Sequence, residues 1–467
     1  MSNEKLGFPG DFILDYFFII NHRGETVNIT DAVVNLNVYE SINSPYLTGD
    51  FTFLDSTDII RANDLGFGQE RVSISLRTPE FEDNVINNEA SNWRVVAVLE
   101  DEVLGAATRK MKMSFTTKEF VKDKQVRISK TYEDTYAEMA VSVLTDENYL
   151  ATKKDIIVEP TKNIHKFCVP DMHPFEFINT IASSCQAKDS NNVGYLFYET
   201  LNNTINFRSY GSLAQPGAAE QDPSELMAYT LGKSANISDG TVKSKLGAIE
   251  SFKPMTHHND IQNLNKGFYG SKLIDFDIYK KTHKTTEYSY FDAFETIPHL
   301  DSSEGLPFSK TPDMVGKTLS DYKDYAQYMA YHTSADENTI THPTTTIQQS
   351  HAEANSWENN RVHIKVPGRP GINAGSMILI VVTDMTISKG DITPTPENLY
   401  SGKYLIDNIQ HTFIFGAPIK IHQMSITAIR DSVESPIAFE KDINEQIQDD
   451  PRICLLYTSD AADDTPC

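Results

Sequence analysis

Histidine side chains of this sequence could hold a metal ion or transfer protons. His257 and His258 are adjacent, so on a strand they would face opposite ways and could not share one ion. His363, His411 and His422 each lie in an alternating apolar segment, where a solvated or hydrogen-bonded histidine is far commoner than a metal ligand. The sequence also lacks the HExxH, GxSxG and Walker-type glycine motifs. These histidines therefore predict no metal site.

Asp275 and Asp277 form the acidic pair that could do acid–base chemistry. Residues two apart on a strand share a face, and two neighbouring carboxylates can hydrolyse a glycosidic bond. This spacing is too common in proteins to identify a hydrolase. We therefore predict no catalytic residue, no cofactor and no metal ligand, and we expect the protein not to be an enzyme.

The cysteines give no redox or metal motif. Cys168 and Cys185 form no CxxC, and Cys185 falls on the apolar face of a helix expected after Pro174, which predicts a buried thiol. The other two cysteines lie in 454–467, where CLLYTSDAADD is similar to a translated sequencing adaptor. We expect residues 454–467 to be an artefact and the polar segment 436–453 to be a mobile tail.

The charge balance is acidic, with 41 Lys and Arg against 65 Asp and Glu and a net charge of −24. A protein that grips nucleic acid by its backbone needs clustered cations, and the densest basic run here is KMK at 110–112. No apolar stretch approaches the roughly 20 residues that cross a membrane, and the first residues do not read as a signal peptide. We expect no specific nucleic-acid binding, no membrane insertion and assembly in a cytoplasm.

Most of the chain has the period-two pattern of half-buried strands between Gly, Asn and Pro turns. Residues 1–130 show it most clearly, with inward faces at Val34, Leu36 and Val38, at Val72, Ile74 and Leu76, and at Met111, Met113 and Phe115. This region predicts a small β-barrel or sandwich.

Residues 131–224 predict a unit of two helices and a hairpin. Thr135 and Glu138 form a capping box ahead of an apolar helical stripe. A second helix begins at Pro174, and strands flank a turn at Asn202 and Asn203.

A second β region occupies 225–260 and 350–435, where RVHIKVPG and IKIHQMSITAIRDS alternate strongly. Residues 261–349 predict an insertion, with a helix that places Tyr322, Ala326 and Met329 on one face. The predicted fold class is α+β, mainly β, with two β-barrel-like domains, an intervening helical and hairpin unit, and an insertion in the second barrel.

Several segments, in this order, resemble the baseplate central hub proteins of contractile-tailed, T-even-like bacteriophages. They are ESINSPYLTGDFTFLDS, VPDMHPFEFINTIASSCQ, FYETLNNTINFRSYGSL, VPGRPGINAGSMILIVV, SGKYLIDNIQHTF and RDS, between residues 33 and 432. The positions that match the family pattern are Asp50, Asp55, Pro170, Asp171, Arg208, Ser209, Gly368, Gly375, Tyr404, Ile406, His411, Arg430 and Asp431. Residues 260–345 depart from that pattern.

The resemblance implies a structural protein of the virion tail baseplate. Such hubs form a homotrimeric ring whose paired barrels imitate six-fold symmetry, so that a three-fold spike meets a six-fold tail tube. The implied partners are the spike or tail-lysozyme protein and the tail-tube or tube-initiator baseplate proteins. We further expect an acidic ring lumen, because a basic wall within about one Debye length (~8 Å) of DNA would retain the passing genome.

Other interpretations stay open at this point. A tip or hub protein of a related contractile injection system would differ in its partners. A β-rich, tail-associated polysaccharide hydrolase would have a cleft with two carboxylates about 5–9 Å apart. A receptor-binding β module would expose an aromatic patch instead of closing a ring.

Overall fold

Strands make up most of the regular structure, which confirms the predicted α+β, mainly β class. The computed structural model describes residues 5–81, 84–88, 93–105, 108–214, 227–231, 244–256, 259–278, 280–294, 296–300, 315–324, 326–332, 346–382, 400–416 and 420–432. The predicted mobile tail (436–453), the adaptor-like segment (454–467) and the pair His257 and His258 lie outside these residues.

The N-terminal region folds into antiparallel strands and two short helices. Its elements are β1 (Ile13–Ile20), β2 (Thr26–Asn28), β3 (Val33–Ser41), β4 (Thr48–Asp55), α1 (Ile59–Ala62), β5 (Arg71–Arg77), β6 (Asn84–Asn87), β7 (Trp93–Leu104), β8 (Thr108–Thr116) and α2 (Lys118–Asp123). The predicted inward faces of β5 and β8 are buried. In β3, a bulge between Val33 and Asn35 shifts the alternation, so Val33 and not the predicted Val34 joins Leu36 in the core.

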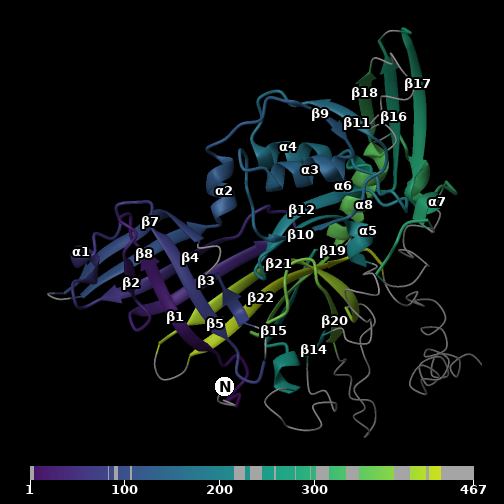
Figure 1. Cartoon of the computed structure of the whole chain (residues 1–467). Helices are drawn as coiled ribbons and strands as arrows, with labels where there is room; N and C mark the ends of the chain where they lie inside the picture. The colour runs from purple at the N-terminus through teal and green to yellow at the C-terminus, as the bar shows by residue number, and fades with distance from the viewer. Residues whose placement is uncertain are drawn as a thin grey trace, which may run out of the picture.

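The middle region is the predicted helical and hairpin unit. Its elements are β9 (Thr131–Asp134), α3 (Tyr136–Thr145), β10 (Asp155–Val158), β11 (His165–Cys168), α4 (Pro174–Ala182), β12 (Tyr195–Thr200), β13 (Thr204–Ser209) and α5 (Tyr210–Ala214). The hydroxyl of Thr135 caps α3 by accepting a hydrogen bond from the Glu138 backbone N–H (3.2 Å). The α4 helix ends before Cys185, whose buried thiol donates to the Ile181 carbonyl (3.2 Å). The helices α3 and α4 lie over the β12 side of this unit (Figure 1).

The C-terminal region again consists mainly of strands. Its elements are β14 (Met227–Leu231), η2 (Ser244–Gly247), β15 (Ser251–Thr256), α8 (Ile347–Asn359), β19 (Asn360–Pro367), β20 (Met377–Val382), β21 (Gly402–Ile414) and β22 (Ile421–Arg430). The apolar side chains of β19, Val362, Ile364 and Val366, are buried beside those of the neighbouring strand β22, as the alternating pattern predicted.

The segment between these strands forms a separate three-stranded sheet that projects from the rest of the chain (Figure 1). Its elements are α6 (Asp260–Asn265), β16 (Gly270–Asp277), β17 (Thr282–Ser289), α7 (Tyr290–Phe294), η4 (Leu319–Asp321) and β18 (Gln327–His332). The helix predicted around Tyr322 to Met329 is wrong. There, β18 pairs in parallel with β16, and this tertiary pairing overrides the local helical spacing, so Ala326 is buried while Met329 is 60% exposed.

One 14-stranded sheet contains strands of both predicted β regions. Its main path is β15-β19-β22-β21-β3-β4-β8-β7-β5-β1-β2. The two regions meet where β3 and β21 pair antiparallel, with Leu36 opposite Phe413. The path ends at β15 and at β2, so no closed barrel occurs in the described part of the chain.

Strands are arranged alike on the two sides of the β3–β21 pair. On one side β3 is followed by β4, β8 and β7; on the other side β21 is followed by β22, β19 and β15. Every one of these pairs is antiparallel. Each β region therefore contributes a four-stranded antiparallel unit beside a common seam.

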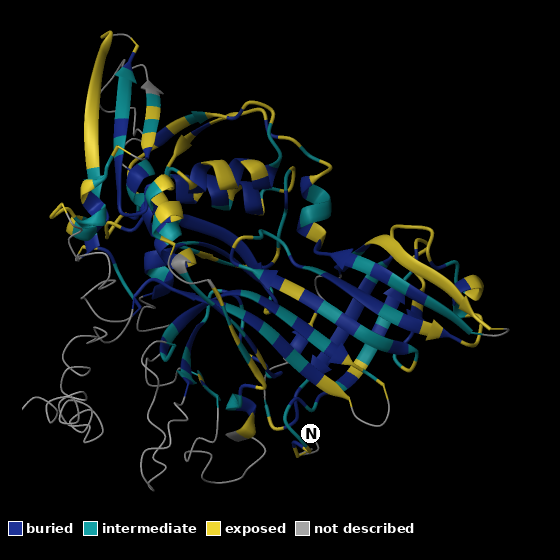
Figure 2. Cartoon of the chain, turned by 180° about the vertical axis from the view of Figure 1, so that it is seen from behind, coloured by how far each residue is buried: buried dark blue, intermediate teal, exposed yellow. Residues whose placement is uncertain are grey.

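The three largest of five apolar clusters among the described residues stabilise these layers, and buried residues alternate mainly with partly buried ones along the large sheet (Figure 2). The N-terminal core includes Phe17, Phe51 and Phe115, but also Phe413 from β21 and Leu201 from the middle region. Because side chains of all three regions share this core, the regions cannot separate without exposing apolar surface to water.

Candidate functional site

The carboxylate of Glu40 joins three parts of the chain that are far apart in the sequence. Glu40 lies in β3 and is 2% exposed. Its Oε2 accepts hydrogen bonds from the backbone N–H groups of Leu201 (3.2 Å) and Ala374 (3.3 Å), and its Oε1 lies 3.0 Å from His411 Nε2. Leu201 follows β12, and Ala374 precedes β20. A buried carboxylate needs such donors, so Glu40 fixes the middle and C-terminal regions on the N-terminal sheet.

His422 extends this contact to the start of the chain. Its Nε2 lies 3.2 Å from Nδ1 of His411, and its ring stacks on Phe413. Its backbone N–H donates to the Gly10 carbonyl and its carbonyl accepts from the Gly368 N–H, both at 2.8 Å. Burial, together with His411, lowers the pKa of His422 well below its usual value, so the ring is neutral at physiological pH.

Two positions of the predicted motif must be glycine, because side chains from other parts of the chain lie too close to leave room for a Cβ atom. A Cβ on Gly368 would lie 2.1 Å from the ring of His422. A Cβ on Gly375, which has φ +82°, would lie 2.2 Å from the hydroxyl oxygen of Tyr198 in β12. Both glycines lie in the loop from β19 to β20, which therefore packs directly against two other parts of the chain.

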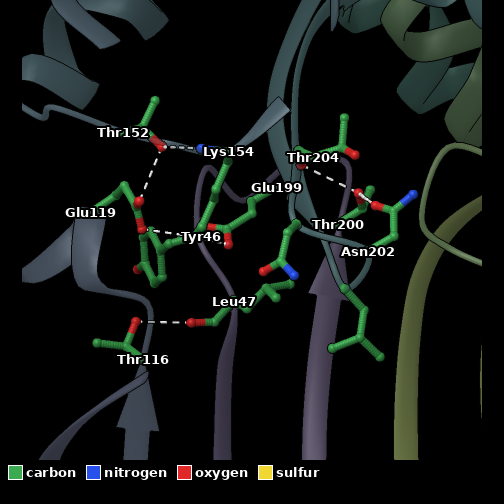
Figure 3. Close-up of polar contacts among 12 residues, drawn as sticks. Tyr46, Leu47, Thr116, Glu119, Thr152, Lys154, Glu199, Thr200, Asn202 and Thr204 are labelled. Atoms are coloured by element: carbon green, nitrogen blue, oxygen red, sulfur yellow. Dashed lines mark hydrogen bonds and ion pairs between the residues drawn. The ribbon is translucent and has the colours of Figure 1, made fainter. Parts of the chain in front are cut away.

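A buried ionic cluster fastens the middle region to α2 (Figure 3). Lys154 Nζ donates to Glu119 Oε2 (2.7 Å) and to Glu199 Oε1, and Glu119 also accepts from the Thr152 hydroxyl (3.0 Å). The three charged side chains are 4% exposed or less. Burial raises the pKa of Glu199 to about 7. Burial also acts to raise the pKa of Glu119, but Lys154 outweighs it and that pKa falls below its usual value.

Asp431 attaches the segment between β15 and β19 to the end of β22. Its Oδ2 lies 2.7 Å from His299 Nδ1, and its Oδ1 accepts from the Leu300 N–H (3.3 Å). The preceding Arg430 places its guanidinium 4.8 Å from the ring centroid of Tyr404. These three motif residues thus lie close together, and Asp431 binds the segment between β15 and β19 to the large sheet.

The solved structure of one tail protein shares this fold. The tail protein of Neisseria meningitidis MC58 aligns with 90% of this chain and 97% of its own, with a TM-score of 0.50 and 10% sequence identity. The chain shares the fold of this tail protein. The 43 kDa tail protein of prophage MuSo2 from Shewanella oneidensis aligns over 90% of this chain and 99% of its own (TM-score 0.48, 10% identity). The type VI secretion system component c3393 of E. coli aligns over 85% of this chain and 73% of its own (TM-score 0.39, 8% identity).

No protein-family model matches the chain, and no curated protein matches it by sequence. The similarity is therefore one of backbone architecture and not of sequence, because only 10% of residues are identical over nearly the whole of the Neisseria tail protein.

Within this tail-protein fold, further motif residues stabilise turns. Asp55 accepts hydrogen bonds from the N–H groups of Thr57, Ile59 and Ile60 (2.9–3.0 Å) and so fixes the start of α1. Burial would raise the pKa of Asp55, but these N–H groups hold it below its usual value. Asp50 ion-pairs with Lys112 across β4 and β8 (3.3 Å).

The remaining motif residues lie elsewhere on the fold. Ser209 donates its N–H to Glu159 (2.8 Å), and Arg208 Nη2 donates to the Ser212 carbonyl (3.1 Å). The N–H of Ile406 donates to the Ser376 carbonyl (3.0 Å). Pro170 and Asp171 precede α4. Asp171 has φ +52° and forms a surface ion pair with Arg127 (3.3 Å).

The site residues predicted from the sequence do not include Glu40, Lys154, Glu119 or Glu199, and no role is predicted there for His422. Glu40 had a readable signal, because it follows Leu36 and Val38 at the next inward position of β3. An acid on an apolar face needs a buried partner, and His411 lies on the inward face of β21, two positions beyond Ile409, which pairs with Glu40. The Lys154 cluster left no such signal, because its members come from unrelated segments.

No set of His, Cys, Asp or Glu residues in the described ranges is arranged to hold a metal ion. His363 lies 3.4 Å from the Thr427 hydroxyl, and Asp277 accepts from the Lys280 N–H (2.9 Å). None of the helices in the same ranges has the length and apolarity needed to cross a membrane.

Proposed function

We propose that this chain is the baseplate hub of a contractile phage tail, in which three copies form a ring between a three-fold spike and a six-fold tail tube. The arrangement of the large sheet carries this proposal. Its two four-stranded antiparallel units lie beside one seam, β3–β21, so three copies would present six units of similar construction. The tail-protein fold, shared over 97% of the Neisseria protein, supports the same role.

The buried junction suits a protein that must transmit force without deforming. Glu40 and the Lys154 cluster connect the regions through hydrogen bonds that water does not reach. The proposed hub would therefore move as a rigid body when the sheath contracts. We assign residues 1–130 and 225–260 with 350–435 to the two β units, and 131–224 to the connecting unit.

The proposed location is the virion tail baseplate, with assembly in the host cytoplasm. The proposed partners are the spike or tail-lysozyme protein on one face and tail-tube or tube-initiator proteins on the other. The role is structural and not enzymatic, and the net charge of −24 suits a lumen through which DNA slides without binding.

The mass of the particle in solution tests this proposal. Light scattering after size exclusion should give three times the 52.5 kDa chain mass for the chain alone, or the mass of three chains plus the bound spike after co-expression with the spike protein of the same tail. A chain that stays monomeric at high concentration in both preparations contradicts the hub function.

A further inference from the structure

The outer half of β7 is a strand edge without a partner in the described part of the chain. β5 pairs with β7 only at Val72–Trp93 and Arg71–Arg94, whereas β8 pairs with β7 from Arg94 to Leu104, with bulges after Val95 and after Val98. Beyond Val95, the far edge therefore leaves backbone N–H and C=O groups for a further strand. Figure 2 shows this half of β7 as a run of exposed residues.

This edge carries five large apolar side chains beside three acidic ones, Glu100, Asp101 and Glu102. The apolar side chains, given with their exposed fractions, are Val96 (54%), Val98 (40%), Leu99 (53%), Val103 (71%) and Leu104 (42%). At one end of the sheet, the edge strand β15 contains Pro254 and Lys253, which are the residues that proteins use to block strand addition. β7 lies between β8 and β5 in the sheet and contains no proline, and beyond Val95 its side facing away from β8 is open to a partner strand.

A cationic cavity of about 670 Å³ adjoins this edge. Val95 and Val96 line it together with Arg71, Arg94, Lys118 and Lys122.

Arg71 and Arg94 are directly opposed on β5 and β7, and Lys122 donates to the Glu147 carbonyl. Across the described ranges, no carboxylate forms an ion pair with any of the four cations. Burial and the neighbouring Arg71 lower the pKa of Arg94, as expected for like charges held together. Four cations without a paired carboxylate, on a chain with net charge −24, form a site that would attract an anion from outside the molecule.

We propose that the β7 edge and this cationic cavity form one docking surface for a second copy of the same chain. The neighbour would add a strand to β7, and one of its carboxylates would enter the cavity. The acidic excess of the chain makes a second copy electrostatically complementary to this cluster. A strand edge beside a cationic cavity needs a different face on the neighbour, and such a heterologous contact closes rings. This inference rests on the proposed trimeric hub and locates its subunit contact.

The observations favour a protein partner over nucleic acid. Duplex DNA binds to basic residues spread along a groove or stripe, whereas these cations line one cavity. The adjoining strand also presents valine and leucine side chains, which match a protein surface and not a phosphate backbone.

The test substitutes exposed residues of this surface in the full chain. Val98→Lys/Val103→Lys adds charge to the β7 edge, and Lys118→Glu reverses one charge at the cavity. Ile261→Lys is the matched control, because Ile261 is 74% exposed and lies on α6. Circular dichroism and thermal melting establish that each variant is folded, and sedimentation equilibrium measures association.

The expected result is at least a tenfold weaker self-association for both surface variants, with the control unchanged. A wild-type trimer whose edge and cavity variants associate equally well overturns the docking surface but leaves the hub function intact. A wild type that stays monomeric with its spike protein overturns both. A short DNA duplex that binds the wild type but not Lys118→Glu, while both variants assemble normally, assigns the cavity to a polyanion and also overturns the inference.

Discussion

Glu40 and His411 are 371 positions apart in the sequence, yet Glu40 Oε1 lies 3.0 Å from His411 Nε2 in the interior of the protein. The contact spans β3 and β21, the strands by which the two β regions join into one sheet. It forms only when both regions are folded and in register. Because Glu40 also holds the backbone at Leu201 and Ala374, the stability of the three regions should be coupled.

Glu40→Ala should therefore destabilise the whole chain. The substitution leaves His411 and the N–H groups of Leu201 and Ala374 buried without an acceptor, and breaking such a buried polar contact costs about 3–5 kcal/mol. Urea unfolding followed by tryptophan fluorescence and by circular dichroism measures the free energy of unfolding. Glu133→Ala is the control, because Glu133 forms an exposed ion pair that contributes at most about 1 kcal/mol. Equal losses in the two variants would contradict a central role for Glu40.

Local patterns in the sequence predicted those parts of the fold that depend on neighbouring residues. The Thr135 cap, the start of α4 at Pro174 and the buried faces of β5, β8, β19 and β22 all follow from short-range periodicity and capping chemistry. The mainly β class followed from the same patterns.

Features set by distant contacts were missed for a physical reason. The bulge at Val33 and the strand β18 in place of a helix both result from pairing with strands elsewhere, which local spacing does not encode. The seam between β3 and β21 was also not predicted, because the register of two strands far apart in the chain depends on the whole core. Glu40 could have been found as an acid on an apolar face, but its three partners could not.

Lys154→Met should destabilise the protein by about 3–5 kcal/mol at pH 7, because it leaves Glu119 and Glu199 buried without their cation. The loss should shrink at pH 5, because without Lys154 the burial of Glu119 and Glu199 favours their protonated, neutral forms. Adding Glu119→Gln and Glu199→Gln to Lys154→Met should restore most of the stability. Chemical unfolding at both pH values measures these changes. The control is Lys166→Met, at an exposed ion pair, and the prediction fails if both lysine variants lose the same stability.

Glu353 should make the protein less stable as the pH rises from about 4.5 to about 8. Its side chain is buried on α8, and burial, together with the charges of Asp431 and Glu159, raises its pKa to about 8. The folded chain thus holds a proton on Glu353 that the unfolded chain has released, so the free energy of unfolding falls through this range. Glu353→Gln keeps the acceptor for Gln349 and removes the ionisation.

The Glu353→Gln variant should match the wild type near pH 4.5 and exceed it by roughly 2 kcal/mol or more at pH 8, given about 1.4 kcal/mol per pKa unit. Thermal melting between pH 4.5 and pH 8.5 compares the two curves. Glu358→Gln on the same helix is the control, since its side chain is 53% exposed. Parallel curves for wild type and Glu353→Gln would show that Glu353 ionises freely in the folded state.

Gly375→Ala should reveal how tightly the C-terminal region packs on the middle region. Gly371 and Gly375 have nearly the same positive φ, +79° and +82°, but a Cβ on Gly371 has no atom within 4 Å, whereas one on Gly375 meets the Tyr198 hydroxyl. Both alanine variants share the strain of a positive φ, so their difference isolates the steric contact. We expect Gly375→Ala to lose about 1–3 kcal/mol more than Gly371→Ala, as for other overpacked sites.

Tyr198→Phe provides the second half of this experiment, because it removes the oxygen that the new methyl group would meet. In a double-mutant cycle, Gly375→Ala should be less destabilising on the Tyr198→Phe background than on the wild type. The free energies come from the same urea titrations. If the penalty is identical on both backgrounds, the loop before β20 moves away from β12 without resistance, and the two regions are not held as one rigid body.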